Sequence, residues 1–195
     1  AMAKVNPYWR FRRTGLRVAD PRRPYVVVSN HESFADILLI SHLPFEMKWL
    51  SKVEILKIPL IGWMMRMAGD IPIKRGFGPS AAEAMERCRA SLRNRVSVIF
   101  FPEGTRSVDG NMLPFKDGAF RLAIEAGVPI LPLAVAGTRT ALPKHDWRFN
   151  PARAVVEVLP PIETAGLTLE DLPQLKERVR ATIQVARDAL RAQLA

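Results

Sequence analysis

The sequence predicts a single three-layer α/β domain with a mixed, largely parallel central sheet flanked by helices. Short apolar strands alternate with helical segments, and no repeat, low-complexity stretch or internal linker interrupts them. This alternation is typical of β-α-β units. A length of 195 residues suits one such domain. We place the domain at 25–195, preceded by a basic and aromatic arm at 1–24.

The overall charge is basic: 29 Lys and Arg residues against 19 Asp and Glu residues give a net charge of +10. This excess favours an anionic partner, namely nucleic acid, an anionic membrane, or an acidic protein or substrate. A single cysteine, Cys88, excludes a disulfide framework and a cysteine metal cluster. No apolar run approaches the ~18–20 residues of a membrane span, and no signal peptide is visible.

The arm at 1–24 combines aromatic and basic side chains. Tyr8, Trp9 and Phe11 lie among arginines at positions 10, 12, 13, 17, 22 and 23. This mixture suits a membrane interface, a nucleic-acid backbone or a solvated basic arm, and the sequence leaves these interpretations open.

The first buried strand, 26–28, leads through a tight break into a helix expected at about 33–43. His31 sits at the break, and Asp36 follows one turn into the helix. A carboxylate within reach of an imidazole is a general-base arrangement, in which the acid holds the tautomer and the free ring nitrogen takes a proton. The stretch Ser33-Phe34-Ala35-Asp36 also matches a capping box. This stretch alone supports both interpretations.

An apolar, Met-rich segment follows a second predicted strand at 47–50. Pro59 must break or kink the run 52–68, and the half after Pro59 is apolar nearly all round. Such a segment is typical of a buried core helix. It also suits an adaptable wall for a flexible acyl chain, or a face that dips into a membrane.

The remaining elements continue the alternation. In an amphipathic helix at about 79–95, Cys88 shares one face with Met85 and Leu92, so we expect it to pack in the core and not to act as a nucleophile. Prolines interrupt the strand at 128–135, which favours an edge or irregular position. The other predicted elements are strands at 71–73, 96–101 and 154–159 and helices at about 116–127 and 171–194.

Polar residues follow several of these strands. Asn30-His31, Lys74-Arg75 and 102–106 each come directly after an apolar strand, and Lys52 follows the strand that ends at Leu50. Ligands gather at the carboxyl ends of strands in parallel sheets. One edge would therefore carry a potential base and several cations suited to phosphate.

Several other chemistries lack their sequence signatures. There is no Walker-type sequence, no Gly-x-Ser-x-Gly elbow and no pairing of metal ligands, so we expect no metal. What remains is base catalysis on a phosphorylated substrate that supplies its own hydroxyl.

Four blocks occur in order along the chain: Asn-His-Glu-Ser-Phe-Ala-Asp at 30–36, Gly-Asp-Ile-Pro-Ile-Lys-Arg at 69–75, Phe-Pro-Glu-Gly-Thr-Arg-Ser at 101–107 and Val-Pro-Ile-Leu-Pro at 128–132. Their order and spacing, over residues 25 to about 140, resemble those of the glycerolipid acyltransferases with a His-x4-Asp motif. The closest subgroup is the 1-acylglycerol-3-phosphate acyltransferases. The chain departs from this family at Pro72 and in lacking the N-terminal hydrophobic helices common there.

The resemblance implies transfer of a fatty acyl group from acyl-coenzyme A or acyl-acyl carrier protein to the sn-2 hydroxyl of 1-acylglycerol-3-phosphate, giving phosphatidic acid, with no cofactor. It implies His31 as the base and Asp36 as the residue that orients it. The residues that it places at the acceptor's glycerol-phosphate are Lys52, Arg75, Glu103, Gly104, Thr105 and Arg106.

The partners that follow are a lysophospholipid acceptor, an acyl thioester donor, which includes the acidic acyl carrier protein, and an anionic membrane surface; no nucleic acid is expected. The expected location is the cytoplasmic face of the inner membrane, either peripheral or anchored through a missing N-terminal segment. The alternatives are a different acceptor, such as glycerol-3-phosphate or a lyso-aminolipid, or a non-catalytic module that binds anionic lipid.

Overall fold

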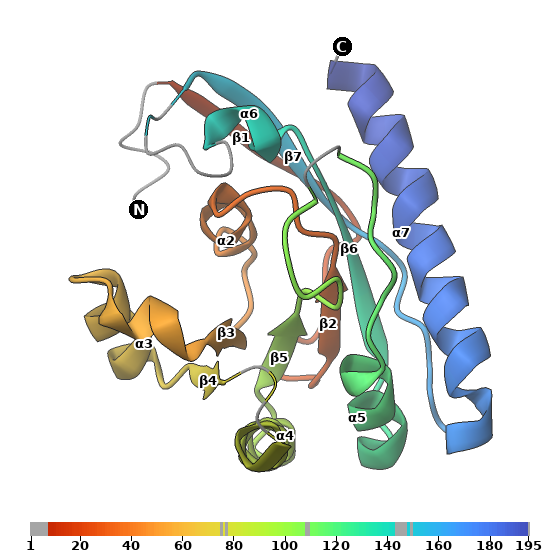
Figure 1. The fold of residues 1–195 in the computed structure, drawn as a ribbon. Helices are drawn as coiled ribbons and strands as arrows, with labels where there is room; N and C mark the ends of the chain where they lie inside the picture. The colour runs from red at the N-terminus through yellow and green to blue at the C-terminus, as the bar shows by residue number, and fades with distance from the viewer. Residues whose placement is uncertain are drawn as a thin grey trace.

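A seven-stranded sheet forms the centre of the protein in the computed structural model (Figure 1). The strand order is β1-β7-β6-β2-β5-β3-β4. Only β6 and β7 pair antiparallel; the other neighbours are parallel, which confirms a mixed, largely parallel sheet. The structure describes residues 8–74, 76, 78–107, 110–142, 148 and 150–194. The strands are β1 (Trp9–Gly15), β2 (Val26–Ser29), β3 (Met47–Lys52), β4 (Ile71–Ile73), β5 (Ser97–Phe100), β6 (Ile130–Ala136) and β7 (Ala152–Val158).

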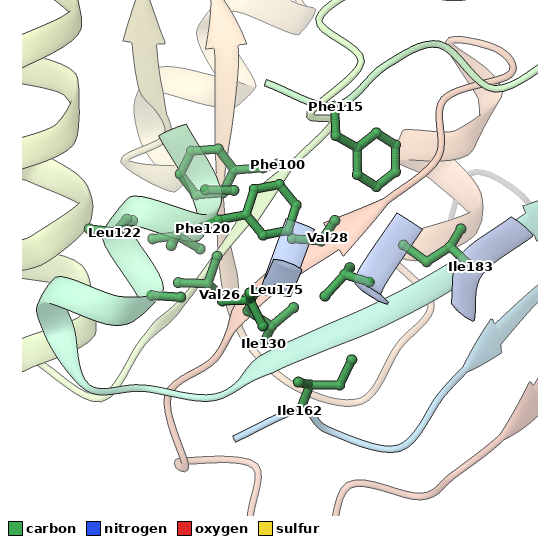
Figure 2. Packing of buried hydrophobic residues seen from close by; sticks show 14 of the residues in the cluster. Val26, Val28, Phe100, Phe115, Phe120, Leu122, Ile130, Ile162, Leu175 and Ile183 are labelled. Atoms are coloured by element: carbon green, nitrogen blue, oxygen red, sulfur yellow. The ribbon is translucent and has the colours of Figure 1, made fainter. Parts of the chain in front are cut away.

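Helices cover both faces of the sheet. Val26 and Val28 of β2 pack in the cluster that includes α4, α5 and α7 (Figure 2), whereas Val27 packs with α2 on the opposite face. Successive strand residues point to opposite faces, so this central strand must be apolar throughout. The helices are α2 (Ala35–Ile40), α3 (Ile61–Ala68), α4 (Gly78–Arg93), α5 (Gly118–Ala126), α6 (Thr138–Ala141) and α7 (Leu172–Leu194), with 3₁₀ turns η1 (Val53–Lys57) and η2 (Leu169–Asp171).

The described part of the expected arm, residues 8–24, contributes a strand to the sheet. β1 pairs in parallel with β7, from Trp9 beside Ala152 to Gly15 beside Val158. Trp9 is buried, stacks on Phe11 and donates its indole N–H to the carbonyl oxygen of Asn150 at 3.0 Å. The expected boundary at residue 25 therefore does not separate β1 from the sheet, and Trp9 is not an exposed membrane contact.

The proline in β6 does not place that strand at an edge, so that prediction is wrong. β6 lies between β7 and β2, and Pro132 is in register with Val28. The carbonyl oxygen of Pro132 accepts from the backbone N–H of Leu159, while the ladder with β7 begins at the next residue, Leu133. The N–H that proline lacks would have returned the bond from Leu159, so its absence affects only the end of this pairing, beyond the ladder of Leu133 to Ala136.

The Met-rich segment forms η1 and α3, which lie at the opposite side of the molecule from α7 (Figure 1). Gly62 allows the two short helices to touch, because a Cβ there would lie 2.1 Å from the carbonyl oxygen of Leu56. Only Gly62 is buried in α3, so this segment is not the buried core helix that was one of its interpretations.

Candidate active site

The residues expected to carry chemistry lie beyond the carboxyl ends of neighbouring strands. His31 follows β2, the stretch 102–106 follows β5, and Lys52 ends β3. Because β2, β5 and β3 are adjacent and parallel, these ends share one edge of the sheet. The loop from β6 to α6 (Thr138–Ala141) reaches the same edge, since β6 is parallel to β2.

His31 and Asp36 are in direct contact. The Nδ1 atom of His31 lies 2.8 Å from Oδ2 of Asp36. With the carboxylate accepting from Nδ1–H, the lone pair is on Nε2, the atom able to take a proton. The imidazole also stacks on the ring of Phe101, with centroids 4.0 Å apart, which fixes its plane.

Asp36 is fully buried and held by several donors. Its Oδ2 also accepts from the backbone N–H groups of Glu32 at 2.8 Å and Ser33 at 3.0 Å, and Oδ1 accepts from the Thr138 hydroxyl. The hydroxyl of Ser33 accepts in turn from the N–H of Ala35. The local helix-start bonds and the bond to His31 therefore coexist, and the same carboxylate serves both purposes.

Glu103, expected at the acceptor, makes structural hydrogen bonds in this structure. Its two carboxylate oxygens accept from the backbone N–H of His31 and of Leu113, each at 2.8 Å, and the residue is only 4% exposed. Burial raises the pKa of Glu103, and these two backbone bonds oppose the rise. Glu103 thus joins the turn at His31 to the loop after β5.

Two of the expected phosphate ligands, Lys52 and Arg106, lie at or just beyond strand ends. Lys52 is exposed at the end of β3, and Arg106 is half-buried; neither side chain has a hydrogen-bond or ion-pair partner among the described residues. Thr105 is exposed between Gly104 and Arg106. Arg75 lies outside the described residues.

Gly104 has a φ of +75°, and a Cβ there would lie 2.9 Å from Nζ of Lys116. This contact brings into the site a cation that the sequence did not single out. Lys116 does not directly follow a strand. Its backbone N–H donates to the carbonyl oxygen of Pro102, and this bond holds Lys116 beside the same loop.

Two cavities of very different size lie near His31. A hollow of about 10 Å³, room for about one water molecule, is lined mostly by polar residues, among them His31, Asn30, Glu103 and Ser107. A second cavity, of about 810 Å³, lies among α2, β3, η1 and α3 and is almost wholly apolar. Its volume is in the range of ~300–1,000 Å³ common for ligand sites. Trp49 in its wall contacts Phe101, the ring on which His31 stacks.

Sequence reasoning missed two side chains that hold the site together. Asn30 bonds the backbone of Val135 in both directions, as donor at 2.9 Å and as acceptor at 2.8 Å, which ties the end of β2 to β6. Thr138 holds Asp36. The available signal was local: Thr138 follows Gly137 directly after an apolar strand, as His31 follows β2.

Neither a metal cluster nor a membrane span is found in the described part of the chain. No three or more His, Cys, Asp and Glu side chains there are grouped so as to hold a metal ion. Among the same residues, no helix combines the length and apolar character needed to cross a bilayer.

Known proteins are similar to this chain in sequence and in fold. The model of the Acyltransferase family matches residues 10–136, ending before α7. The 1-acyl-sn-glycerol-3-phosphate acyltransferase alpha of Homo sapiens is 43% identical over 162 residues, which are 82% of this chain and 57% of the human protein. The chloroplastic 1-acyl-sn-glycerol-3-phosphate acyltransferase BAT2 of Brassica napus is 41% identical over 144 residues, 73% of this chain and 42% of that protein. The chain thus spans about half the length of these curated relatives.

A solved structure is similar along most of the chain. The 1-acyl-sn-glycerophosphate (LPA) acyltransferase PlsC from Thermotoga maritima superposes with a TM-score of 0.76 at 31% identity, covering 92% of this chain and 72% of that one.

Proposed function

Since this chain belongs to the Acyltransferase family, we propose that it transfers a fatty acyl group from a thioester to the sn-2 hydroxyl of 1-acylglycerol-3-phosphate, giving phosphatidic acid. The observation that carries the proposal is the placement of His31. Its ring is oriented by Asp36, the loop with Arg106 follows the neighbouring strand β5, and Phe101 links the ring to an apolar cavity. An acyl-transfer site needs a base between a place for a polar acceptor and a place for a hydrocarbon chain.

The base chemistry follows from the His31–Asp36 contact. The Nε2 atom of His31 removes the proton of the acceptor hydroxyl as its oxygen attacks the thioester carbonyl. Asp36 stabilises the imidazolium that forms, and the proton then passes to the departing thiolate. A positioned base of this kind typically contributes ~10²–10⁴-fold to the rate.

The acceptor's phosphate is assigned to the cations around the loop after β5. Arg106 and Lys52 have charges that no described carboxylate neutralises, and Lys116 lies beside Gly104. Arginine offers phosphate two parallel N–H donors. Clamping the phosphate fixes which hydroxyl meets His31, so positioning supplies much of the rate. Arg75 remains a proposed member of this set.

The apolar cavity is assigned to a fatty acyl chain. Its wall includes Met64 and Met65, whose flexible side chains adapt to an occupant of variable shape. The donor is a thioester on coenzyme A or on acyl carrier protein. The basic net charge of +10 favours either anionic carrier.

One face of α3, together with the residue before this helix, is assigned to contact with an anionic membrane. Leu60, Trp63, Met64 and Met67 recur at the spacing of a single helical face, and all four are exposed, Trp63 by 59% and Met67 by 70%. Leu60 and Met64 also line the apolar cavity, so the exposed face is continuous with the proposed acyl site. We infer peripheral attachment at the cytoplasmic face, where donor thioesters are made.

The experiment is an acylation assay with one acyl thioester and a panel of acceptors. Turnover should be fastest with 1-acylglycerol-3-phosphate and should require His31. Preference for glycerol-3-phosphate or for a lyso-aminolipid would replace the acceptor in the proposal. Absence of transfer to every acceptor, with retained binding of anionic vesicles, would favour the non-catalytic lipid-binding alternative.

A further inference from the structure

Two arginines of the helix α7 reach the site, although this helix lies beyond the family match: Arg191 bonds to the catalytic turn, and both Arg191 and Arg187 bond to the loop after β5. The Nη2 atom of Arg191 lies 2.6 Å from Oε1 of Glu32, and its Nε lies 3.2 Å from the same oxygen. Arg191 Nη2 also donates to the carbonyl oxygen of Gly110 at 2.9 Å. Arg187, one turn earlier, reaches that carbonyl at 3.4 Å and pairs with Asp188.

Glu32 is the residue after His31 and belongs to the turn that holds the base. Its backbone N–H donates to Asp36, and its Oε2 accepts from the N–H of Gly137 at the end of β6. Burial raises the pKa of Glu32, and the Arg191 guanidinium opposes that rise. The charged form of Glu32 therefore depends on a residue far away in the sequence.

Gly110 belongs to the loop that carries Arg106. Its N–H donates to the hydroxyl of Ser107 at 2.9 Å, and its φ is +88°. A Cβ at Gly110 would lie 2.2 Å from an Arg139 guanidinium nitrogen, so the loop is closely packed at this point. Arg191 consequently contacts the turn of the base and the loop of the phosphate ligand with one side chain.

We propose that Arg191 is a positioning residue, which fixes the separation between His31 and the acceptor-phosphate site by joining Glu32 to Gly110. The proposal rests on the proposed function, because it assigns Arg106 to the acceptor. This role differs from that of a purely stabilising ion pair, which would stabilise the fold without affecting how the acceptor is positioned relative to His31. A buried ion pair is weak evidence for stability by itself, so kinetic constants must decide.

The test compares Arg191→Gln, Glu32→Gln and the double variant with a matched control, Arg178→Gln, whose side chain is exposed on the same helix. The measurements are kcat, KM for 1-acylglycerol-3-phosphate, KM for the acyl thioester and Tm. We expect Arg191→Gln to raise the acceptor KM and to lower kcat/KM for the acceptor by at least about fivefold. The thioester KM and the control should be unchanged.

Two further readouts separate positioning from stability. The effects of Arg191→Gln and Glu32→Gln should be less than additive, because both remove one contact. Compared with Arg191→Gln, Arg191→Lys should restore part of the acceptor kcat/KM, since lysine keeps the charge but has one nitrogen in place of the Nε and Nη2 atoms that bond to Glu32 and Gly110. A lowered Tm with unchanged kinetic constants, or equal changes in both KM values, would overturn the proposal.

Amide hydrogen exchange tests the connection without substrate. In Arg191→Gln the N–H groups of Gly110 and Leu113 should exchange faster than in wild type and in Arg178→Gln. Unchanged exchange overturns the proposal even if the enzyme were found to use another acceptor. Faster exchange in a protein with no acyl transfer would instead overturn the proposed function and leave the connection in place.

Discussion

Thr138 donates its hydroxyl hydrogen to Asp36, and both side chains are completely buried. The bond joins the first residue of α6 to the carboxylate that orients His31. With Oδ2 taken by His31 and two backbone N–H groups, Thr138 supplies the side-chain partner of Oδ1. Asp36 thus orients the imidazole of His31, and Thr138, which follows β6, holds Asp36 in place.

Thr138→Val should lower both stability and turnover. Valine has nearly the shape of threonine but leaves Oδ1 of a buried carboxylate without its hydroxyl, a loss of about 1–3 kcal/mol. Thr138→Ser should recover most of kcat. Denaturant unfolding and kcat measure the two effects, and Thr182→Val, which removes an exposed hydroxyl on α7, serves as the control. Equal behaviour of the two valine variants would show that Thr138 does not orient the site.

His31→Ala should abolish turnover while the protein still folds. A base contributes at least ~10²-fold, so more than about a tenth of the wild-type rate would contradict the assignment. His42→Ala is the matched control, because its Nδ1 bonds only to the carbonyl oxygen of Leu38. The third histidine, His145, lies outside the described residues.

Arg106→Lys should impair acceptor binding even though the charge is kept, because lysine lacks the guanidinium fork. We expect a higher KM for the acceptor and an unchanged KM for the thioester in steady-state kinetics. Lys52→Gln should act in the same direction. If Arg106→Lys leaves acceptor kinetics unchanged, Arg106 is a solvated residue and the phosphate must be bound elsewhere.

Trp63→Ala should remove most of the salt-resistant binding to anionic vesicles. Apolar insertion is insensitive to salt, whereas attraction of basic side chains, about 1 kcal/mol each near the surface, is screened. Co-sedimentation at low and high salt measures both parts. Trp9→Ala should lower Tm without changing vesicle binding, because Trp9 is buried in the sheet. Equal binding to neutral and anionic vesicles would contradict this attachment.

Stability should fall at high pH through Cys88. Burial raises the pKa of its thiol from the usual 9.0 to about 12. The neutral thiol therefore contributes stability that is complete below pH 9 and is lost as pH rises toward 12, by at most about 1.4 kcal/mol per pH unit. Between about pH 8 and 10.5, Tm should fall more steeply in wild type than in Cys88→Ala. Parallel slopes would contradict the buried position.

The strands and long helices were predictable because their hydrophobic periods are strong. The helix expected at 79–95 is found at Gly78–Arg93, and the one expected at 171–194 at Leu172–Leu194. The helix expected at 33–43 is shorter, Ala35–Ile40, because the residues before it turn around the Asp36 carboxylate. β1 was not recognised as a strand, since its arginines and aromatic residues gave no apolar run.

The contacts of the candidate site also fall into two groups, those that the sequence predicted and those that it did not. The His31–Asp36 contact is local in sequence, and residue type and spacing indicated it beside the capping-box interpretation. The resemblance places Glu103 at the acceptor, but the hydrogen bonds of its two oxygens to the backbone N–H groups of His31 and Leu113 could not be predicted from local sequence. Thr138 and Arg191 act across long stretches of chain. The position of Thr138 after an apolar strand marks it as a site candidate, but no local pattern reveals that its partner is Asp36 or that the partner of Arg191 is Glu32.

The pairing of β1 with β7 also constrains how the sheet assembles. β1 begins at Trp9, and its partner strand ends at Val158, so the edge strand can be docked only after most of the chain has been synthesised. Contacts between such distant segments slow folding, because a long loop must close before they form. We expect β1 to join late, so that substitutions at its interface accelerate unfolding more than they slow refolding. Until β1 joins, the free edge of β7 is open to pairing with another chain during biosynthesis.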